Sequence, residues 1–257
     1  MAVIFYLSGS GNSLYAAQQI AEKLEECRLE TIGSYLRKPY TVEDEIVGIV
    51  SPVYCFALPP VVAQFLEKLN AKPNYCFGVV TMGGNQGRAL KQMSEALSAK
   101  GVTLNYAQTV IMPDNFFGIP DEKRKEQLKA AEPTIAKFAE EIAQGKADVA
   151  AVKEAMLWKL FGTSASWWYL KNRLNFEKMT VDAAKCVGCG ICADICQMKN
   201  ITLVDGKPTF GTSCANCLGC VHWCPQSAIS AGKLTVDNTR RYVNPNINLE
   251  MMKGEQK

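Results

Sequence analysis

The sequence predicts an α/β protein, in which a doubly wound parallel sheet of five strands is followed by a small α+β domain rich in cysteine. Strand and helix patterns alternate through residues 1–145, which is typical of a parallel sheet with helices on both faces. Eight of the 11 cysteines then fall between residues 186 and 224, in two similar runs. We therefore expect one domain at 1–148, a connecting segment at 149–177, a second domain at 178–236 and a polar C-terminal tail at 237–257 that is extended or disordered.

The elements of the first domain follow from apolar runs for the strands and from amphipathic stretches for the helices. AVIFYL is a short apolar strand, and in the stretch that follows it Leu14, Ala17 and Ile20 fall on one side of a helix. TIGSY, at 31–35, is a weaker fifth strand. The other expected strands are 2–7, 45–50, 76–82 and 102–112, and the expected helices are 13–26, 61–69, 87–100 and 122–144.

The composition allows an ordinary packed core, because 48% of the residues are hydrophobic. The N-terminus MAVIFYLSGS lacks the basic start and the long apolar run of an export signal, so we expect a cytoplasmic chain. In such a reduced compartment, clustered cysteines bind metal more often than they form disulfides. The net charge of +3 gives no support for nucleic-acid binding.

Two stretches raise the question of a membrane. Residues 46–66 carry no charge, but Pro52, Pro59 and Pro60 interrupt them, which favours a buried strand, a loop and a helix over a membrane span. Residues 151–177 hold three of the four tryptophans and several basic residues, so an interfacial membrane helix is one interpretation. We favour the other, in which these aromatic residues pack against one or both domains.

The loop LSGSGNS, residues 7–13, joins the first expected strand to the first expected helix. Free backbone N–H groups and the helix dipole meet at such a junction and attract an anion, and Gly9 and Gly11 let the backbone come close. It is not a dinucleotide fingerprint, since Leu14 stands where the third glycine belongs, and no GK[ST] follows it. A plain turn between strand and helix is the alternative. The short side-chain donors around the expected anion are Ser8, Ser10, Asn12 and Ser13.

Two later loops, SPVYCFALPP and TMGGNQG, follow strands at the same edge, where ligands bind in doubly wound sheets. The loop at 7–13 resembles the phosphate loop of flavodoxins, T-G-T-G-N-T in its common form, with serine for each threonine. That resemblance implies FMN, and no second nucleotide motif supports FAD. In flavodoxin-like proteins SPVYCFALPP would flank the isoalloxazine ring, although Tyr54 and Phe56 as simple loop anchors are the alternative. MPDNFFG, at 112–118, either covers the flavin, faces a partner or is structural. The expected contacts from the two later loops are Pro52, Val53, Tyr54, Phe56, Thr81, Met82, Gly83, Gly84 and Asn85.

Two runs of the form C-x2-C-x2-C-x3-C begin at residues 186 and 214. Zinc sites usually take two cysteines from each of two separated segments, so this spacing favours [4Fe–4S] clusters over zinc. Three cysteines at successive spacings of three surround one face of a cube, and the fourth points away to the other cluster. The expected ligands are Cys186, Cys189, Cys192 and Cys224 for cluster I, and Cys214, Cys217, Cys220 and Cys196 for cluster II.

The residue after each run differs. The second run ends with Cys224 and Pro225, the common form, whereas Gln197 follows Cys196. Proline stiffens the turn there but supplies no ligand atom, so we expect Gln197 to be a local variation. His222, the only histidine, is expected to pack or to tune a cluster, because the cysteines already complete both clusters. The other cysteines, Cys27, Cys55 and Cys76, are expected to be small buried residues, Cys55 being notable for its place in a flavin loop.

The cysteine pattern of residues 178–236 resembles bacterial two-[4Fe–4S] ferredoxins, and the first 145 residues are similar to flavodoxins. Their order, together with PVYCFALP, MPDN and CVHWCP, resembles the flavodoxin–ferredoxin fusions known as EFR1-family ferrodoxins, which occur mainly in anaerobes. The resemblance implies an electron-transfer protein that relays low-potential electrons between two [4Fe–4S] clusters and an FMN on one chain. It also implies redox partner proteins, without identifying them.

Two other functions stay open. One is an FMN-dependent reductase of a small acceptor such as a quinone, fed by the clusters, although the first domain has no histidine for acid–base work and no nicotinamide site. The other is a redox sensor or assembly module, which the absence of a DNA-binding motif disfavours. For the relay, we expect segment 151–177 to dock the second domain so that one cluster lies near the flavin loops.

Overall fold

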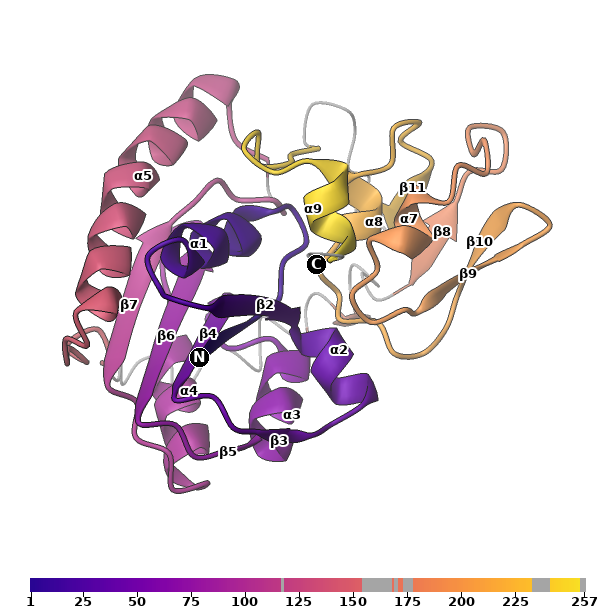
Figure 1. Ribbon diagram of the computed structural model, residues 1–257. Helices are drawn as coiled ribbons and strands as arrows, with labels where there is room; N and C mark the ends of the chain where they lie inside the picture. Colours follow the sequence, from indigo (N-terminus) through magenta and orange to yellow (C-terminus); the bar gives the residue numbers. More distant parts are fainter. Residues whose placement is uncertain (117, 154–167, 169–170, 173–177, 233–240, 255–257) are drawn as a thin grey trace.

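The computed structural model describes residues 1–116, 118–153, 168, 171–172, 178–232 and 241–254, and it contains the predicted five-stranded parallel sheet (Figure 1). The strand order is β2-β1-β4-β6-β7, the doubly wound order in which ligands bind at the carboxyl edge. Every neighbouring pair in this sheet is parallel. The strands are β1 Ala2–Tyr6, β2 Cys27–Thr31, β4 Ile46–Pro52, β6 Tyr75–Met82 and β7 Tyr106–Ile111.

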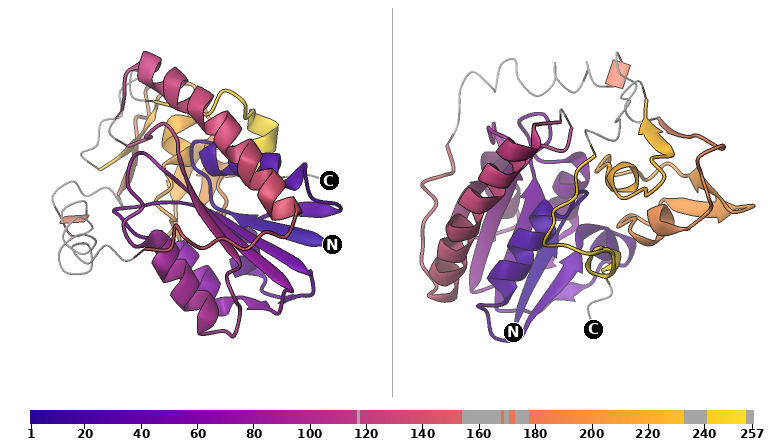
Figure 2. Two further views of the ribbon diagram at one scale, coloured as in Figure 1. Left: turned by 90° about the vertical axis from the view of Figure 1, so that its left-hand side faces the viewer. Right: turned by 90° about the horizontal axis from the view of Figure 1, so that it is seen from above.

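Helices cover both faces of the sheet, as the alternating pattern predicts (Figure 2). On one face α1 Asn12–Ala21 packs against α5 Asp121–Ala143. The other face is covered by α2 Ile32–Arg37, α3 Pro60–Lys68 and α4 Ala89–Ser98. A separate short parallel pair consists of β3 Thr41–Val42 and β5 Asn70–Ala71.

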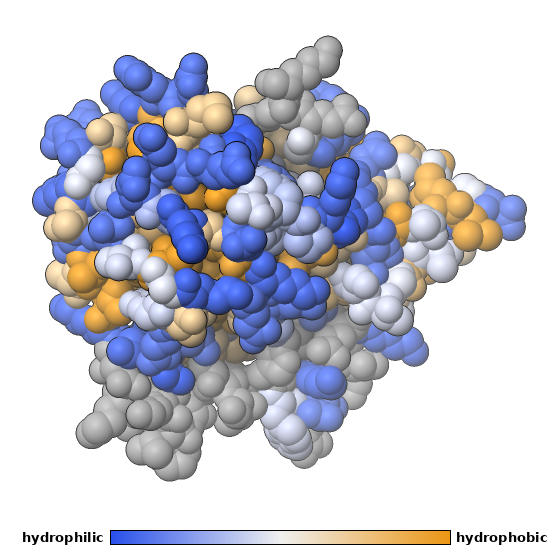
Figure 3. Space-filling view, turned by 60° about the horizontal axis from the view of Figure 1, so that its bottom comes forward, coloured by the Kyte–Doolittle hydropathy of each residue, from blue (hydrophilic) through white to orange (hydrophobic). Residues whose placement is uncertain are grey.

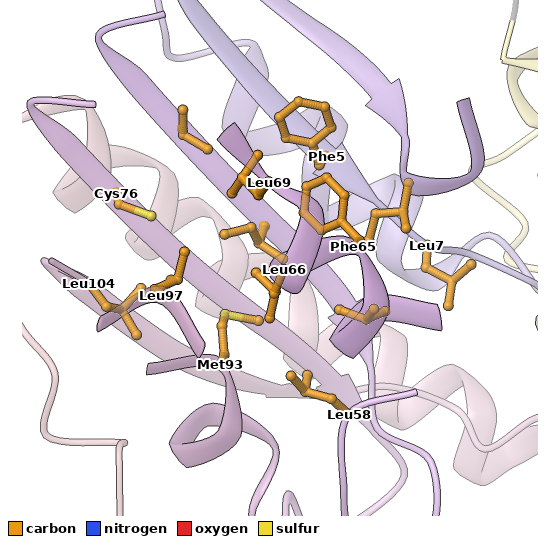
Figure 4. Close-up of a cluster of buried hydrophobic side chains, with 14 of the residues drawn as sticks. Phe5, Leu7, Leu58, Phe65, Leu66, Leu69, Cys76, Met93, Leu97 and Leu104 are labelled. Atoms are coloured by element: carbon orange, nitrogen blue, oxygen red, sulfur yellow. The ribbon is translucent and has the colours of Figure 1, made fainter. Parts of the chain in front are cut away.

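The larger core lies between the sheet and the α3–α4 layer (Figure 4). The ring of Phe5 lies 4.9 Å from that of Phe65 and 5.4 Å from that of Tyr35, measured between centroids. Burying an apolar side chain of this size stabilises the fold by about 1.5–3 kcal/mol. Its neighbours Ile4 and Tyr6 point to the opposite face, into the core beneath α1 and α5. Burial on both faces is why β1 is apolar at nearly every position.

The strand predicted at 31–35 is wrong. β2 ends at Thr31, whose hydroxyl oxygen accepts a hydrogen bond from Ser34 N (3.0 Å) and thereby caps α2. β2 is an edge strand that is partly exposed, and its sequence CRLET lacks the apolar run that marks the buried strands. The strand expected at 102–112 is also shorter than predicted, because β7 begins only at Tyr106.

The cysteine-rich part is the small α+β unit that the sequence predicts. β8 Met179–Val181 pairs antiparallel with β11 Ile229–Ala231, and β9 Ile201–Val204 pairs antiparallel with β10 Lys207–Phe210. Asp205 and Gly206 form the β9–β10 turn, both with positive φ, the backbone form that a two-residue hairpin requires. Leu203 and Val204 of this hairpin are exposed. Figure 3 shows hydrophobic surface on the projection at the right of the view, next to a hydrophilic tip. The short helices α7 Ile191–Asp194 and α8 Gly219–His222 each lie within a cysteine run.

Residues 241–254, here called the C-terminal segment, do not form the extended or disordered tail that the sequence predicts. Tyr242, Asn244 and Met252 are buried, and α9 Leu249–Lys253 packs into the core on the α1 face. Asn248 caps α9 by accepting a hydrogen bond from Met251 N (2.9 Å). The prediction treated polar residues as exposed, whereas asparagine often serves as a cap or as a buried hydrogen-bonding partner.

The cysteine-rich part packs directly on the first domain. Ile195 belongs to the core on the α1 face, and Ala215 belongs to the core on the α3 face. The predicted docking role of segment 151–177 falls mostly on residues 154–167, 169–170 and 173–177, which lie outside the described part of the chain. Within the described part, no helix has both the length and the apolar character needed to cross a membrane.

Candidate cofactor sites

A pocket lies at the carboxyl edge of the sheet, where the loops after β1, β4, β6 and β7 meet. These loops are distant in sequence but converge because parallel strands all end at one edge. The 112–115 part of MPDNFFG, whose role the sequence left open, contributes to the wall. The residues of the predicted FMN site that line the pocket are Ser8, Gly9, Ser10, Asn12, Ser13, Pro52, Val53, Tyr54, Thr81, Met82 and Gly83, and those of the loop after β7 are Met112, Pro113, Asp114 and Asn115.

Hydrogen bonds tie the loops of this pocket to one another. The hydroxyl groups of Ser13 and Thr81 are 2.8 Å apart, and Val53 N donates to Thr81 O (3.0 Å). Asn12 Nδ2 donates to Pro113 O (3.0 Å), which joins the loop after β1 to the loop after β7. The walls are therefore held in position by the protein itself.

Four predicted contacts, Gly11, Phe56, Gly84 and Asn85, lie outside the lining of the pocket. Tyr54 and Ala57 exchange two backbone hydrogen bonds of 2.9 Å, and the residues between them have positive φ, so Phe56 sits in a tight turn. Its carbonyl accepts from Arg88 N (2.8 Å), away from the pocket. Asn85 Oδ1 accepts from Gly87 N (2.7 Å) and stabilises its own loop.

The serine-rich end of the pocket fits a phosphate group. Ser8, Ser10 and Ser13 are each no more than 3% exposed, and Ser8 Oγ has no hydrogen-bond partner among the described residues. The loop leads into the N-terminus of α1, whose first turn contains no acidic residue. A buried hydroxyl without a partner and the positive end of a helix dipole both favour an anion here. We refer to residues 7–13 as the phosphate loop.

A second hollow is lined by four cysteines, here called the first cysteine group: Cys186, Cys189, Cys192 and Cys224. Three come from the first run and Cys224 comes from the end of the second, which is the combination expected for cluster I. Ala228 N donates to Cys224 Sγ (3.3 Å). Burial raises the pKa of Cys192 to about 11; the neighbouring Cys189 and Cys224 contribute to this rise, and a hydrogen bond from the backbone of Ala193 opposes it. Thiolates at this position need a compensating positive charge, which an iron–sulfur core supplies.

The second cysteine group consists of Cys196, Cys214, Cys217 and Cys220. Burial raises the pKa of Cys220 well above its ordinary value, and the other three members raise it further, followed by Cys192 of the first group. Asn200 N donates to Cys196 Sγ, and Asn216 N donates to Cys214 Sγ, both at 3.3 Å. The grouping is the crossed one expected from the sequence, while the ligation itself stays a prediction. Among the described residues, no three Cys, His, Asp or Glu side chains are arranged to hold a single metal ion.

The second cysteine group lies against the phosphate loop. A Cβ atom on Gly9 would lie 1.9 Å from Cys217 O, so the missing side chain that we assigned to anion binding also makes room for the cysteine run. Trp223 Nε1 donates to Gly9 O (3.0 Å). Burial raises the pKa of Tyr54, and Cys217 and Cys214 raise it further, which places this pocket residue beside the group. The pocket and the second cysteine group therefore share a boundary.

Gln197 is not the local variation that the sequence suggests. It is 6% exposed, and its Oε1 accepts a hydrogen bond from Ser8 N (3.2 Å) in the phosphate loop. Arg37 Nη1 donates to Gln197 O, and the absence of a Cβ on Gly33 leaves room for that carbonyl. Proline at position 197 could not provide the side-chain acceptor. No local pattern reveals this contact, because its partners are 189 residues apart.

Replacing Gln197 with leucine is expected to lower the free energy of unfolding by about 1–3 kcal/mol, because Ser8 N–H then stays buried without an acceptor. Urea unfolding measures the change. Gln144→Leu is the matched control, since this glutamine is exposed at the end of α5. Equal losses in the two variants would show that the Gln197–Ser8 bond contributes nothing.

The C-terminal segment reaches the phosphate loop from another side. Tyr242 Oη and Asn244 Nδ2 both donate to Asn12 Oδ1, at 2.8 and 3.1 Å. Asn244 N donates to Ser10 O (2.8 Å). Asn12 was predicted as a phosphate donor, yet its Nδ2 donates to Pro113 O and its Oδ1 accepts from this segment. The sequence does not indicate these contacts, because a stretch rich in asparagine is typical of exposed chain.

His222 and Cys55 have no place in the lining of either cavity. His222 is buried, its Nδ1 accepts from Tyr242 N (3.3 Å), and burial lowers its pKa to about 4. It therefore packs as a neutral ring between the cysteine-rich part and the C-terminal segment. Cys55 is half-buried in the tight turn after Tyr54, and burial raises its pKa to about 11.

Comparison with known proteins identifies two domain types. Residues 3–114 match the family model of the flavodoxin domain, and residues 179–202 match that of the 4Fe-4S binding domain. Two-electron reduced Megasphaera elsdenii flavodoxin is 17% identical, with a TM-score of 0.36, over 51% of this chain and 99% of that chain. Fusobacterium nucleatum flavodoxin bound to flavin mononucleotide is 14% identical, with a TM-score of 0.38, over 56% of this chain and 96% of that chain. No match was found among curated proteins.

The flavodoxin match covers the pocket at the sheet edge, and the 4Fe-4S match covers part of the lining of the second hollow. The flavodoxin match contains every residue that lines the pocket at the sheet edge except the last, Asn115. The 4Fe-4S match contains the whole first cysteine run. The chain therefore joins a flavodoxin domain and a 4Fe–4S binding domain on one polypeptide, the two components of electron transfer with FMN and an iron–sulfur cluster.

Proposed function

We propose that the protein relays low-potential electrons between two [4Fe–4S] clusters and one FMN held on the same chain. FMN exchanges one or two electrons and each cluster exchanges one, so the chain's task is to hold and tune these groups. The single observation that carries the proposal is the contact between Gly9 of the phosphate loop and Cys217 of the second cysteine group. Two cofactors bound at these places would be neighbours.

Different residues would hold the different cofactors. The serines and free N–H groups of the phosphate loop would hold the phosphate, and Tyr54 would flank the flavin ring. The first and second cysteine groups would each hold one cluster. In this arrangement residues 1–148 form the flavin domain and residues 178–236 form the cluster domain. Membership of the EFR1 family stays a prediction.

The order of the sites rests on packing contacts. Cys192 of the first group and Cys220 of the second lie in one hydrophobic cluster, so the two groups are neighbours. Cys217 of the second group lies against Gly9, which lines the pocket. We therefore propose the sequence first group, second group, flavin, with the first group exchanging electrons with a partner protein. Cys189 of that first group is exposed.

A flavin-dependent reductase of a small acceptor remains the second candidate from the sequence. The only histidine of the chain, His222, is buried and lies outside the pocket lining, so it is not placed to transfer protons to an acceptor there. Steady turnover of a quinone by the loaded protein would favour the reductase over the carrier.

Anaerobically purified protein is expected to contain about eight irons, about eight sulfides and one FMN per chain. The measurement is iron, sulfide and flavin analysis together with a visible spectrum. Zinc in place of iron, or protein that binds no FMN, would refute the proposed function.

A further inference from the structure

The phosphate loop is hydrogen-bonded on the side that faces away from its pocket. Gly9 O accepts from Trp223 Nε1 (3.0 Å), and Ser10 O accepts from Asn244 N (2.8 Å). Neither donor belongs to the flavodoxin domain, since Trp223 lies in the second cysteine run and Asn244 lies in the C-terminal segment. The residues that line the pocket include Gly9 and Ser10, but neither of these two donors.

These two bonds determine where the next N–H groups point. The described part of the chain has no cis peptide, and in a trans peptide the carbonyl of one residue and the N–H of the following residue point in opposite directions. Holding Gly9 O outward therefore turns the N–H of Ser10, a lining residue, inward. Holding Ser10 O outward turns Gly11 N–H toward the same side of the loop, although Gly11 itself does not line the pocket. Inward N–H groups at a helix N-terminus are what an anion requires.

We propose that Trp223 and Asn244 are positioning residues for the phosphate of FMN, so that the cysteine-rich part and the C-terminal segment set the affinity of the flavodoxin domain for that phosphate. This inference rests on the proposed FMN site. It assigns a binding role to two residues that do not touch the ligand.

Both donors are themselves held firmly. Asn244 is fully buried, its Nδ2 donates to Asn12 Oδ1 (3.1 Å), and its Oδ1 accepts from Asn246 N (3.0 Å). Trp223 immediately precedes Cys224, which lies in the first cysteine group. The position of the indole N–H, and with it the conformation of the phosphate loop, therefore depends on how well the cysteine run is ordered. The affinity for FMN is expected to depend on whether the clusters are bound.

Trp223→Phe removes the indole N–H and keeps an aromatic ring. With the clusters in place and the flavin removed, the variant is expected to bind FMN about two- to tenfold more weakly than the wild type, because one hydrogen bond is lost. Riboflavin, which lacks the phosphate, is expected to bind both proteins equally. Quenching of flavin fluorescence gives both affinities. Trp168→Phe, at an exposed tryptophan, is the matched control.

An equal loss for FMN and riboflavin would mean that Trp223 only packs, and no loss for either would mean that its hydrogen bond is irrelevant. Both results overturn the inference. A wild-type protein that binds neither flavin refutes the proposed function instead. If Trp223→Phe does not fold, Asn244→Ala and Asn244→Pro decide, because only proline removes the N–H that holds Ser10 O. The inference is supported if only the affinity for FMN falls and if it falls further in Asn244→Pro than in Asn244→Ala. It is overturned if the two variants bind FMN with equal affinity.

Discussion

A variant carrying both Cys196→Ala and Cys214→Ala is expected to keep about four irons per chain, whereas one carrying both Cys196→Ala and Cys189→Ala is expected to keep almost none. The reason is the crossed arrangement of the sites. Cys196 and Cys214 belong to the second cysteine group, so together they remove one cluster. Cys189 belongs to the first group, so the second pair removes one ligand from each cluster. Iron and sulfide analysis of anaerobically purified protein measures the difference.

The opposite pattern would show that each run holds its own cluster. In that case the pair Cys196 and Cys189 would spare the second run and keep about four irons, while the pair Cys196 and Cys214 would damage both clusters. Cys27→Ala is the control, because this half-buried cysteine of β2 lies far from both runs in the sequence and outside both groups. It is expected to leave about eight irons.

Much of the fold could be predicted from the sequence because strands buried on both faces are marked by apolar runs. β1, β4 and β6 were located in this way. The sequence misplaces β2 because none of the residues of this edge strand is fully buried, so it has no apolar run, and its sequence CRLET is as polar as a loop. The start of α2 depended on the cap at Thr31, whose hydroxyl could equally have belonged to a strand.

The cofactor loops and cysteine groups could be predicted for a different reason. Ligand spacing is local, and parallel strands bring their following loops to one edge whatever the details of packing. The contacts between the two domains are not local. The Ser8–Gln197 bond spans 189 residues, and the Gly9–Trp223 bond spans 214. Neither glutamine nor tryptophan follows a pattern that indicates such a partner.

Two separate structural reasons explain why residue 9 is a glycine. In the sequence it is explained by a backbone that must approach an anion, and this explanation is sufficient. In the structure the same missing side chain admits Cys217 O, at a distance where no Cβ could remain. The sequence cannot tell whether a glycine is needed for anion binding, for close packing against another domain, or for both. The packing of the two domains in the structure shows that the second reason applies to Gly9.

Replacing Gly9 with alanine is expected to separate the two domains at the phosphate loop. The new Cβ would lie 1.9 Å from Cys217 O and 2.9 Å from Cys217 C, and both are backbone atoms that no side-chain rotation can move aside. Overpacking of this kind costs about 1–3 kcal/mol of folding free energy. The shift also lengthens the Trp223–Gly9 hydrogen bond. Because the proposed relay needs the second cysteine group beside the flavin, reduction of the flavin by the clusters is expected to slow.

Urea unfolding and stopped-flow absorbance of the loaded protein measure these two effects. For stability, Gly84→Ala is the matched control, because a Cβ there meets no atom within 4 Å, and we expect a change of less than about 0.5 kcal/mol. Gly33→Ala tests the same interface from α2, since its Cβ would lie 2.1 Å from Gln197 O. If Gly9→Ala and Gly33→Ala both unfold like Gly84→Ala, the domains do not pack as described. If they lose stability while flavin reduction keeps its rate, the contact holds the fold together but electrons do not cross it.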